Sequence, residues 1–186
     1  MARENKTKYA LLGMLLRGPL SGYDMKKFSD SSISHFWSEN YGHIYPILKR
    51  LEKDALVTSD VVQTPGKPNR HLYNLTDKGR KVFMEWLKKP ADAEIRRNEF
   101  LLKIFFSGVL TVQDVIRIIE HERVRNEKTL KIYNQIGQEY IGKIDKEGAK
   151  KNAYLTLSYG NKLSSARAQW FEEVLEELKG RNDGSN

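Results

Sequence analysis

Apolar side chains recur at helical spacing between residues 42 and 55. They stand at i, i+3, i+4 and i+7, at Ile44, Ile47, Leu48 and Leu51, and this period is typical of a helix that buries one face. The opposite face carries Pro46, Lys49 and Lys53, and its flanks carry Tyr45 and Arg50. Proline is tolerated in the first turn of a helix, where no intrahelical acceptor is needed. We therefore predict a helix that starts near Gly42 or His43 and ends at about Ala55.

The pattern then changes to short runs that are typical of strands. We predict a strand over residues 56–64, a turn over 65–69 and a return strand over 70–75. Asp60 is the only acidic residue between Leu56 and Leu75, whereas Lys67 and Arg70 lie near the tip of the hairpin. A basic helix followed by a basic hairpin is the plan of a winged helix-turn-helix. In that plan one element enters the major groove of DNA and the other lies on the neighbouring backbone.

Two further helices are predicted before residue 42 and one after the hairpin. The first covers residues 8–17, with Thr7 available as its N-cap, and stops at a glycine and a proline. Ser21 and Asp24 have the spacing of a capping box, which opens a short helix through about residue 30. Thr76 is placed to cap a helix over residues 77–89, which ends at Pro90.

The second half of the chain is helical in character and contains no proline after residue 90. We predict helices over residues 92–106, 111–140 and 151–179. Arg123 and Asn126 interrupt the apolar stripe of the middle helix, so a partner there must be polar or absent. Small residues in the last helix permit another helix to cross closely, at Gly160, Ser164, Ser165 and Ala168.

Three helices joined by short loops can hardly bury this apolar surface alone, so we predict that the chain pairs with a second copy. The predicted dimerisation residues are in the last helix, at Leu157, Gly160, Ser164, Ala168, Phe171, Leu175 and Leu178. Four aromatic residues are candidates for an effector pocket, although aromatic side chains on buried helices more often belong to the core: Phe105, Phe106, Tyr159 and Trp170. Such a pocket would take a small aromatic or other hydrophobic effector.

The fold class that follows is mainly α with a small β-hairpin wing. We expect a winged helix-turn-helix DNA-binding domain over residues 1–89, a helical dimerisation and effector domain over 90–180, and a flexible tail over 181–186. The formal net charge of +8 is unevenly placed, because residues 1–89 hold 16 Lys or Arg against 9 Asp or Glu, and the remainder holds 16 against 15. Positive charge concentrated on one module is expected of a protein that binds the phosphate backbone, although many soluble domains also have a basic surface.

Three ordered motifs resemble the PadR family of bacterial transcriptional regulators: LLGMLLRGPLSGYDMKKF, YPILKRLEKDALV and LYNLTDKGRKVF. The resemblance covers roughly residues 8–87 and implies that Tyr45 points toward the phosphate backbone. The family usually has glycine where Ala55 ends the recognition helix, and a small hydroxyl residue where His43 begins it. Left-handed backbone is costly for alanine, and residues at the helix N-terminus influence base preference. The C-terminal half resembles, more loosely, the C-terminal helical domain of the longer PadR subfamily, as in the virulence activators. This implies dimerisation there, and often an effector sensed between the domains.

We therefore predict a homodimeric, sequence-specific DNA-binding regulator of an inverted-repeat operator. A repressor is favoured over an activator, because repression needs only occlusion of a promoter; release by a small molecule is a further expectation. The predicted contacts with double-stranded DNA are Tyr41, His43, Tyr45, Pro46, Lys49, Arg50, Lys53, Lys67, Asn69 and Arg70. Two alternatives stay open, a winged-helix protein-interaction module without specific DNA binding and a module that binds structured RNA.

Other classes of function have little support in the sequence. The four histidines are scattered and no phosphate-binding loop, dinucleotide fingerprint or nucleophile elbow occurs, so we expect no catalytic residues, no metal and no cofactor. The chain has no cysteine, no apolar run of the ~20 residues that a membrane span needs, and no hydrophobic signal core. We expect a cytoplasmic protein without a membrane partner.

Overall fold

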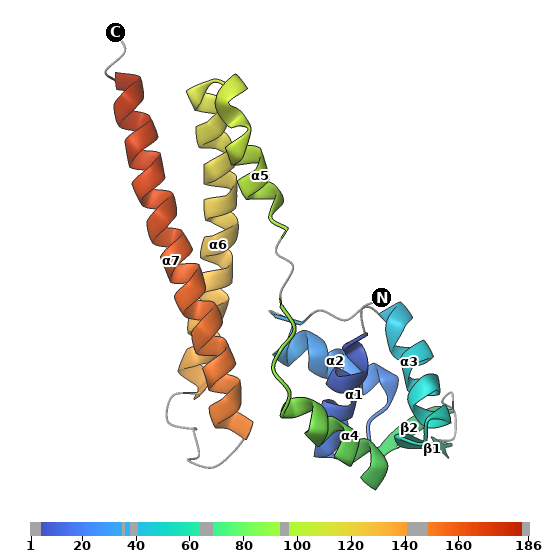
Figure 1. Cartoon of the computed structure of the whole chain (residues 1–186). Coiled ribbons are helices and arrows are strands. Elements are labelled where there is room, and N and C mark those ends of the chain that lie inside the picture. Colours follow the sequence, from blue (N-terminus) through green and yellow to red (C-terminus); the bar gives the residue numbers. More distant parts are fainter. Residues whose placement is uncertain are drawn as a thin grey trace. The chain divides into compact units, whose positions relative to one another are not determined.

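A computed structural model of the chain describes residues 5–34, 36–37, 41–63, 69–93, 97–140 and 149–183. It divides into two compact units, Met1–Ala93 and Glu94–Asn186. The N-terminal unit contains α1 (Thr7–Met14), the short 3-10 turn η1 (Leu15–Arg17), α2 (Gly22–Ser32), α3 (Tyr41–Lys53), β1 (Val57–Val62), β2 (Arg70–Leu75) and α4 (Asp77–Leu87) (Figure 1). The C-terminal unit contains α5 (Glu99–Phe105), the short turn η2 (Ser107–Val109), α6 (Val112–Tyr140) and α7 (Ala149–Asp183).

The N-terminal unit is a three-helix core extended by the hairpin and α4. Side chains from all four helices and both strands are buried together, among them Leu11, Leu12, Met25, Ile44, Leu48, Leu51, Val57, Tyr73 and Phe83. β1 and β2 are antiparallel, with Val57 opposite Leu75 and Val62 opposite Arg70. Leu20 forms a bridge to Tyr73 through two backbone hydrogen bonds of 3.2 and 2.9 Å. Leu20, in the loop before α2, therefore pairs with β2 as an isolated antiparallel bridge beside the hairpin.

The predicted N-caps of α2 and α4 are present in the structure, and the predicted N-cap of α1 is not. The Ser21–Asp24 capping box is present at the start of α2, and Thr76 Oγ1 accepts a hydrogen bond from the Gly79 amide at the start of α4. Thr7, however, is the first residue of α1 and not its N-cap. The Asn5 side chain accepts the Thr7 amide at 2.9 Å instead, so the asparagine supplies the acceptor two residues earlier.

The recognition helix α3 is displaced by one or two residues at its start and by two at its end from the predicted range. It starts at Tyr41, so Pro46 lies in the second turn and not in the first. It ends at Lys53, and Ala55 adopts the left-handed backbone conformation with φ of 56°. β1 is shorter than the predicted strand over residues 56–64, and β2 has the predicted bounds. Residue 64 and residues 65–68 of the predicted turn lie outside the described residues.

The C-terminal unit is built on the long antiparallel pair of α6 and α7 (Figure 1). One stretch of the pair is apolar, where Ile116 and Ile119 of α6 pack with Phe171 and Leu175 of α7 and with α5. The next stretch is polar: Asn126 Nδ2 donates to the Ser164 carbonyl at 2.8 Å, and Arg123 forms ion pairs with Glu127 and Glu172. The prediction was that any partner at Arg123 and Asn126 is polar or absent, and the partners that the structure shows are polar.

Several helix limits in this unit differ from the predicted ones. Residues 91–93 are not helical, and α5 begins only at Glu99, where the Asn98 side chain caps it by accepting the Leu101 amide at 3.1 Å. α7 continues to Asp183, through the first three residues of the segment expected as a tail. No helix in the described part of the chain is long and apolar enough to cross a membrane.

Candidate nucleic-acid interface

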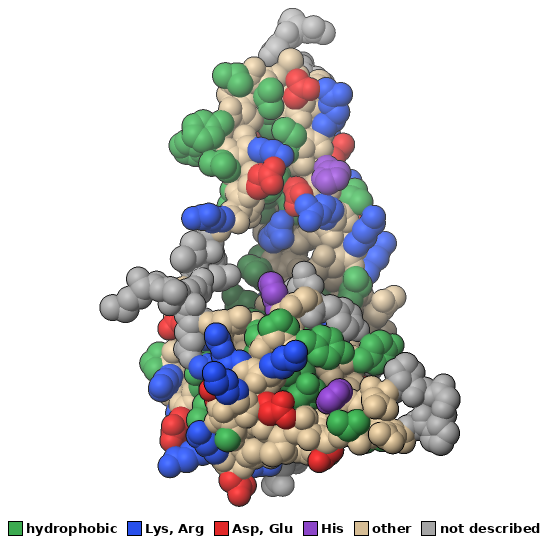
Figure 2. Space-filling view, turned by 90° about the vertical axis from the view of Figure 1, so that its right-hand side faces the viewer, with side chains coloured by type: hydrophobic (Ala, Val, Ile, Leu, Met, Phe, Trp, Pro, Cys, Tyr) green, Lys and Arg blue, Asp and Glu red, His purple; other side chains and the backbone are tan. Residues whose placement is uncertain are grey.

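The two faces of α3 differ sharply in burial. Ile44, Leu48 and Leu51 are at most 1% exposed and fix the helix on the core. The predicted DNA-contacting residues on the other side are exposed, namely His43, Tyr45, Pro46, Lys49, Arg50 and Lys53. Figure 2 views the molecule from the α3 side of the N-terminal unit, where basic and apolar side chains stand together on the surface. Lys49, Arg50 and Lys53 thus place three positive charges on the exposed face of α3.

The acidic residue on this face, Glu52, is engaged by the wing. Ser59 of β1 donates a hydrogen bond from its hydroxyl to Glu52 Oε1. Nearby, burial, followed by the negative charge of Glu52, raises the pKa of the Tyr73 hydroxyl. Tyr73 therefore stays a neutral core residue, and Glu52 ties the recognition helix to the first strand of the hairpin.

Tyr45 lies between α3 and the first turn of α2. Its ring covers Gly22, where a Cβ atom would stand 2.8 Å from Cε1 and 3.3 Å from the hydroxyl oxygen of the tyrosine. The side chain is nevertheless 46% exposed. Glycine at position 22 thus permits an aromatic residue of the recognition helix to rest on α2 while keeping surface for another contact.

Arg70, at the start of β2, reaches across to α2. Its guanidinium donates from Nη2 to Asp24 Oδ2, the oxygen that also accepts the Ser21 hydroxyl at 2.7 Å and the Ser21 amide at 3.0 Å. Burial alone would raise the pKa of the Asp24 carboxyl, but the hydrogen bonds from Ser21, together with Arg70, outweigh burial and hold this pKa below its ordinary value. Asp24 was predicted only as part of a helix cap, and its link to Arg70 went unforeseen. Nothing local in the sequence joins two residues that are 46 positions apart.

The structure does not place every predicted contact. Lys67 lies outside the described residues, and the Tyr41 side chain is likewise not described. Asn69 is exposed immediately before β2. Tyr23, absent from the predicted set, is 61% exposed on the first turn of α2, next to the glycine that Tyr45 covers.

The four candidate effector residues do not meet around one cavity. Phe105 and Phe106 contact each other edge to face and are 81% and 66% exposed, and Tyr159 is 65% exposed. Trp170 instead packs edge to face against Phe100 and Phe171 in the core. Their role in effector binding stays a prediction.

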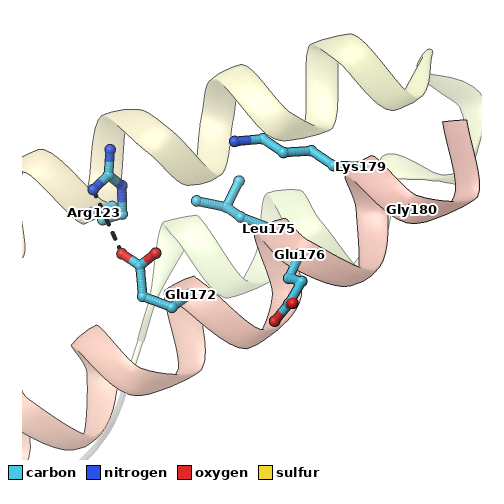
Figure 3. A pocket seen from close by; sticks show the side chains of 6 residues that line it. All are labelled: Arg123, Glu172, Leu175, Glu176, Lys179 and Gly180. Atoms are coloured by element: carbon cyan, nitrogen blue, oxygen red, sulfur yellow. Dashed lines mark ion pairs between the residues drawn. The ribbon is translucent and has the colours of Figure 1, made fainter. Parts of the chain in front are cut away.

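A cavity between α6 and α7 is lined by other residues, all of them labelled in Figure 3: Arg123, Glu172, Leu175, Glu176, Lys179 and Gly180. Arg123 Nη1 lies 3.5 Å from Glu172 Oε1, and Lys179 pairs with Glu120 at 3.6 Å. Arg123 and Glu172 thus pair within the lining, whereas Lys179 pairs with a residue of α6 that does not line the cavity. Among the described residues, no three His, Cys, Asp or Glu side chains are grouped as a metal ion would require.

Most of the predicted dimerisation residues pack within their own chain. Leu157, Ser164, Phe171 and Leu175 are between 0% and 7% exposed, Ala168 and Leu178 are half-buried, and Gly160 lies beneath the ring of Tyr133. A helix does cross the small-residue patch as expected, but it is α6 of the same chain. Six exposed large hydrophobic residues lie in and beside α5 and η2, at Leu101, Leu102, Phe105, Phe106, Val109 and Leu110, and others are spread along α6 and α7, among them Val124, Ile132, Leu155 and Leu163.

Helices α1 to α3, the hairpin and the exposed basic face define a winged helix-turn-helix protein. The pattern of the Transcriptional regulator PadR-like family matches residues 11–85, and that of the Virulence activator alpha C-term matches residues 96–179. The chain is 32% identical over 124 residues to the negative transcriptional regulator PadR of Bacillus subtilis, covering 66% of this chain and 68% of that protein. The chain therefore belongs to the PadR-like family of transcriptional regulators, which confirms the sequence-based assignment.

Solved structures agree over nearly the whole chain. Bacillus subtilis PadR in complex with operator DNA matches with a TM-score of 0.86 and 26% identity, covering 94% of this chain and 99% of that one. The same protein in complex with p-coumaric acid matches with a TM-score of 0.80, 26% identity and the same coverage. The Vibrio cholerae virulence activator AphA matches with a TM-score of 0.74 and 25% identity, covering 94% and 98%. These matches confirm the predicted fold class.

Proposed function

We propose that this regulator binds an inverted-repeat operator as a homodimer in the cytoplasm and represses transcription by occluding a promoter. The observation that carries the proposal is the exposed basic face of α3, where Lys49, Arg50 and Lys53 stand opposite a fully buried apolar stripe. A helix with this division of surfaces fits the major groove. Bacillus subtilis PadR, a named negative regulator, has been solved with operator DNA, which supports the same use of the shared fold.

The apolar surface on α5 and η2 supports the homodimer. Its six large hydrophobic residues are close in sequence and between 45% and 91% exposed, and clustered exposed apolar side chains mark interaction sites. A second copy is the partner that twofold symmetry and a palindromic operator require. Residues of α7 that were expected in the interface would then act indirectly, by supporting α6 from within the chain.

Release by a small hydrophobic or aromatic effector is the second part of the proposal. Bacillus subtilis PadR binds p-coumaric acid, an aromatic carboxylic acid. In this chain Phe105, Phe106 and Tyr159 offer exposed aromatic surface. No enzymatic role is proposed, because the exposed side chains form a binding face and the family consists of transcriptional regulators.

The experiment that tests the proposal is selection of fragmented genomic DNA by the purified protein at ~0.15 M salt, where non-specific contacts are weakened. We expect enrichment of one inverted repeat, occupied by two protomers in a mass measurement of the complex. Equal recovery of all fragments would contradict sequence-specific binding and favour a protein-interaction module. Stronger binding to a duplex RNA competitor would favour recognition of structured RNA.

A further inference from the structure

Asp24 is held rigidly in the first turn of α2. Its Oδ2 atom accepts two hydrogen bonds from Ser21, one from the hydroxyl and one from the amide, and its own amide donates back to the Ser21 hydroxyl at 3.2 Å. Ser21 is 4% exposed and packs in the core. The carboxylate therefore has one orientation, set by buried groups.

Arg70 is the long-range partner of this carboxylate. The guanidinium has five N–H donors in a planar fork, and only Nη2 is engaged by Asp24. Asp24 is the only side chain with which Arg70 pairs among the described residues, and the arginine side chain remains 53% exposed. Donors on the other nitrogens are available for a further acceptor.

The position of this pair connects the wing with the recognition helix. Gly22, two residues before Asp24, is covered by the ring of Tyr45 from the exposed face of α3. Arg70 belongs to the wing and Tyr45 to the recognition helix, yet both rest on the first turn of α2. A DNA strand that crosses this turn would meet both side chains.

We propose that Asp24 is a positioning residue that holds Arg70 in the orientation in which its remaining donors bind a DNA phosphate. This inference rests on the proposed DNA-binding function. An arginine on a free surface must give up rotamer freedom when it binds, whereas a guanidinium already fixed by a carboxylate does not. Phosphate recognition by the remaining donors also suits the fork geometry of arginine. Asp24 itself makes no contact with the nucleic acid.

The test is a double-mutant cycle with Asp24→Asn, Arg70→Ala and the double variant. Affinity is measured by fluorescence anisotropy on two labelled duplexes, one with the inverted repeat from the genomic selection and one of mixed sequence at about 0.05 M salt. We expect Asp24→Asn to weaken binding about three- to tenfold when Arg70 is present, and less than about twofold in the Arg70→Ala background. The slope of the logarithm of the binding constant against the logarithm of the salt concentration (the salt slope) should become shallower by about 0.9 for each phosphate that the protein no longer neutralises.

Two matched variants separate positioning from other effects. Asp30→Asn removes the same charge from the exposed side of α2, where Asp30 pairs with Lys26 and not with Arg70, and should leave the affinity and the salt slope unchanged. Asp24→Glu retains a carboxylate and should recover part of the affinity. Thermal unfolding of each variant checks that it is folded at the temperature of the binding assay.

Other results would overturn the inference. Equal effects of Asp24→Asn with and without Arg70 would mean that the carboxylate acts only through the helix cap. Tighter binding by Asp24→Asn would mean that Asp24 withholds Arg70 from DNA. In both cases the unsubstituted protein still binds, so the proposed function survives. If the unsubstituted protein binds neither of the two duplexes, both this inference and the proposed function are overturned.

Discussion

The amide of Leu56 donates a hydrogen bond to the carbonyl of Leu51 at 2.8 Å, closing the end of the recognition helix. A second bond, from the Ala55 amide to the Glu52 carbonyl at 2.9 Å, lies inside the first. This pair of bonds is the Schellman motif, which requires left-handed backbone at the residue whose amide donates the inner bond. Ala55 supplies it with φ of 56°. Both leucines are buried, so the turn fixes the path from α3 into the wing.

We expect Ala55→Gly to stabilise the protein. Left-handed backbone costs a residue with a Cβ atom roughly 1–2 kcal/mol, and the greater freedom of glycine in the unfolded chain offsets part of that. The net gain in the free energy of unfolding should be about 0.5–1 kcal/mol in urea denaturation. As a control, Ala166→Gly on the exposed side of α7 should lose about 1 kcal/mol. A loss of stability in Ala55→Gly would contradict the strain at this position.

The sequence alone predicted much of this unit. Local signals were sufficient for the capping box, for β2 and for the buried stripe of α3, because each depends on spacing within a few residues. The start of α3, predicted near Gly42 or His43, was wrong by one or two residues, since Pro46 was assumed to require the first turn. The link from Arg70 to Asp24 could not be predicted, because only the tertiary fold brings β2 beside α2.

In the C-terminal unit the helix types were predicted and the partners were not. An apolar stripe on a helix shows that something covers it, but not whether the cover belongs to the same chain. Phe171 and Leu175 were assigned to a dimer contact and are covered by α5 and α6 instead. The exposure of the apolar side chains in and beside α5 could not be predicted, because α5 is short and periodicity does not distinguish its buried face.

Gly79→Ala should be strongly destabilising. A Cβ atom at this position would stand 2.0 Å from the Leu56 carbonyl oxygen, a backbone atom held by the amide and hydroxyl of Thr76. Either the start of α4 or the turn after α3 must shift, at a cost of about 3 kcal/mol. Gly180→Ala is the matched control, since a Cβ atom there meets no neighbour within 4 Å. That variant should keep or slightly raise the unfolding temperature.

Lys49→Ala and Lys53→Ala should each weaken operator binding about 3- to 30-fold, as expected when a charged side chain is removed from a DNA interface. If a lysine binds phosphate, the salt slope should also become shallower by about 0.9. Anisotropy titrations over a range of salt concentrations give both quantities. Lys151→Ala, an exposed lysine of α7, controls for the removal of one charge. Unchanged affinity and slope in both α3 variants would exclude this face as the DNA interface.

Phe105→Glu should convert the dimer into monomers at micromolar concentration. The ring is 81% exposed in the single chain, and burying a carboxylate in a contact between copies would cost several kcal/mol. Sedimentation equilibrium measures the change, and operator affinity should fall with it. Gln113→Glu adds the same charge at an exposed position of α6 and should leave the dimer intact. A dimeric Phe105→Glu would place the interface elsewhere.

Acid should reduce the contribution of Asp24 to stability. Because its pKa in the folded protein lies below the ordinary value of 3.8, the carboxylate stabilises the fold above that value, and this contribution is lost as pH falls through the lowered pKa. Asp24→Asn should therefore be less stable than the unsubstituted protein at pH 7, with the difference shrinking at pH values below about 4. Denaturant unfolding of both proteins at several pH values measures it. A difference that does not vary with pH would contradict the lowered pKa.

The polar stretch between α6 and α7 favours the observed alignment of the two helices. Sliding α7 by one turn, about 5.4 Å, would separate Asn126 from the Ser164 carbonyl and move the Tyr133 ring from Gly160 onto a larger residue. An apolar seam with leucine throughout would tolerate such slippage, but this one does not. The register of α6 against α7 is consequently set by a small residue and a polar contact, and not by the apolar side chains alone.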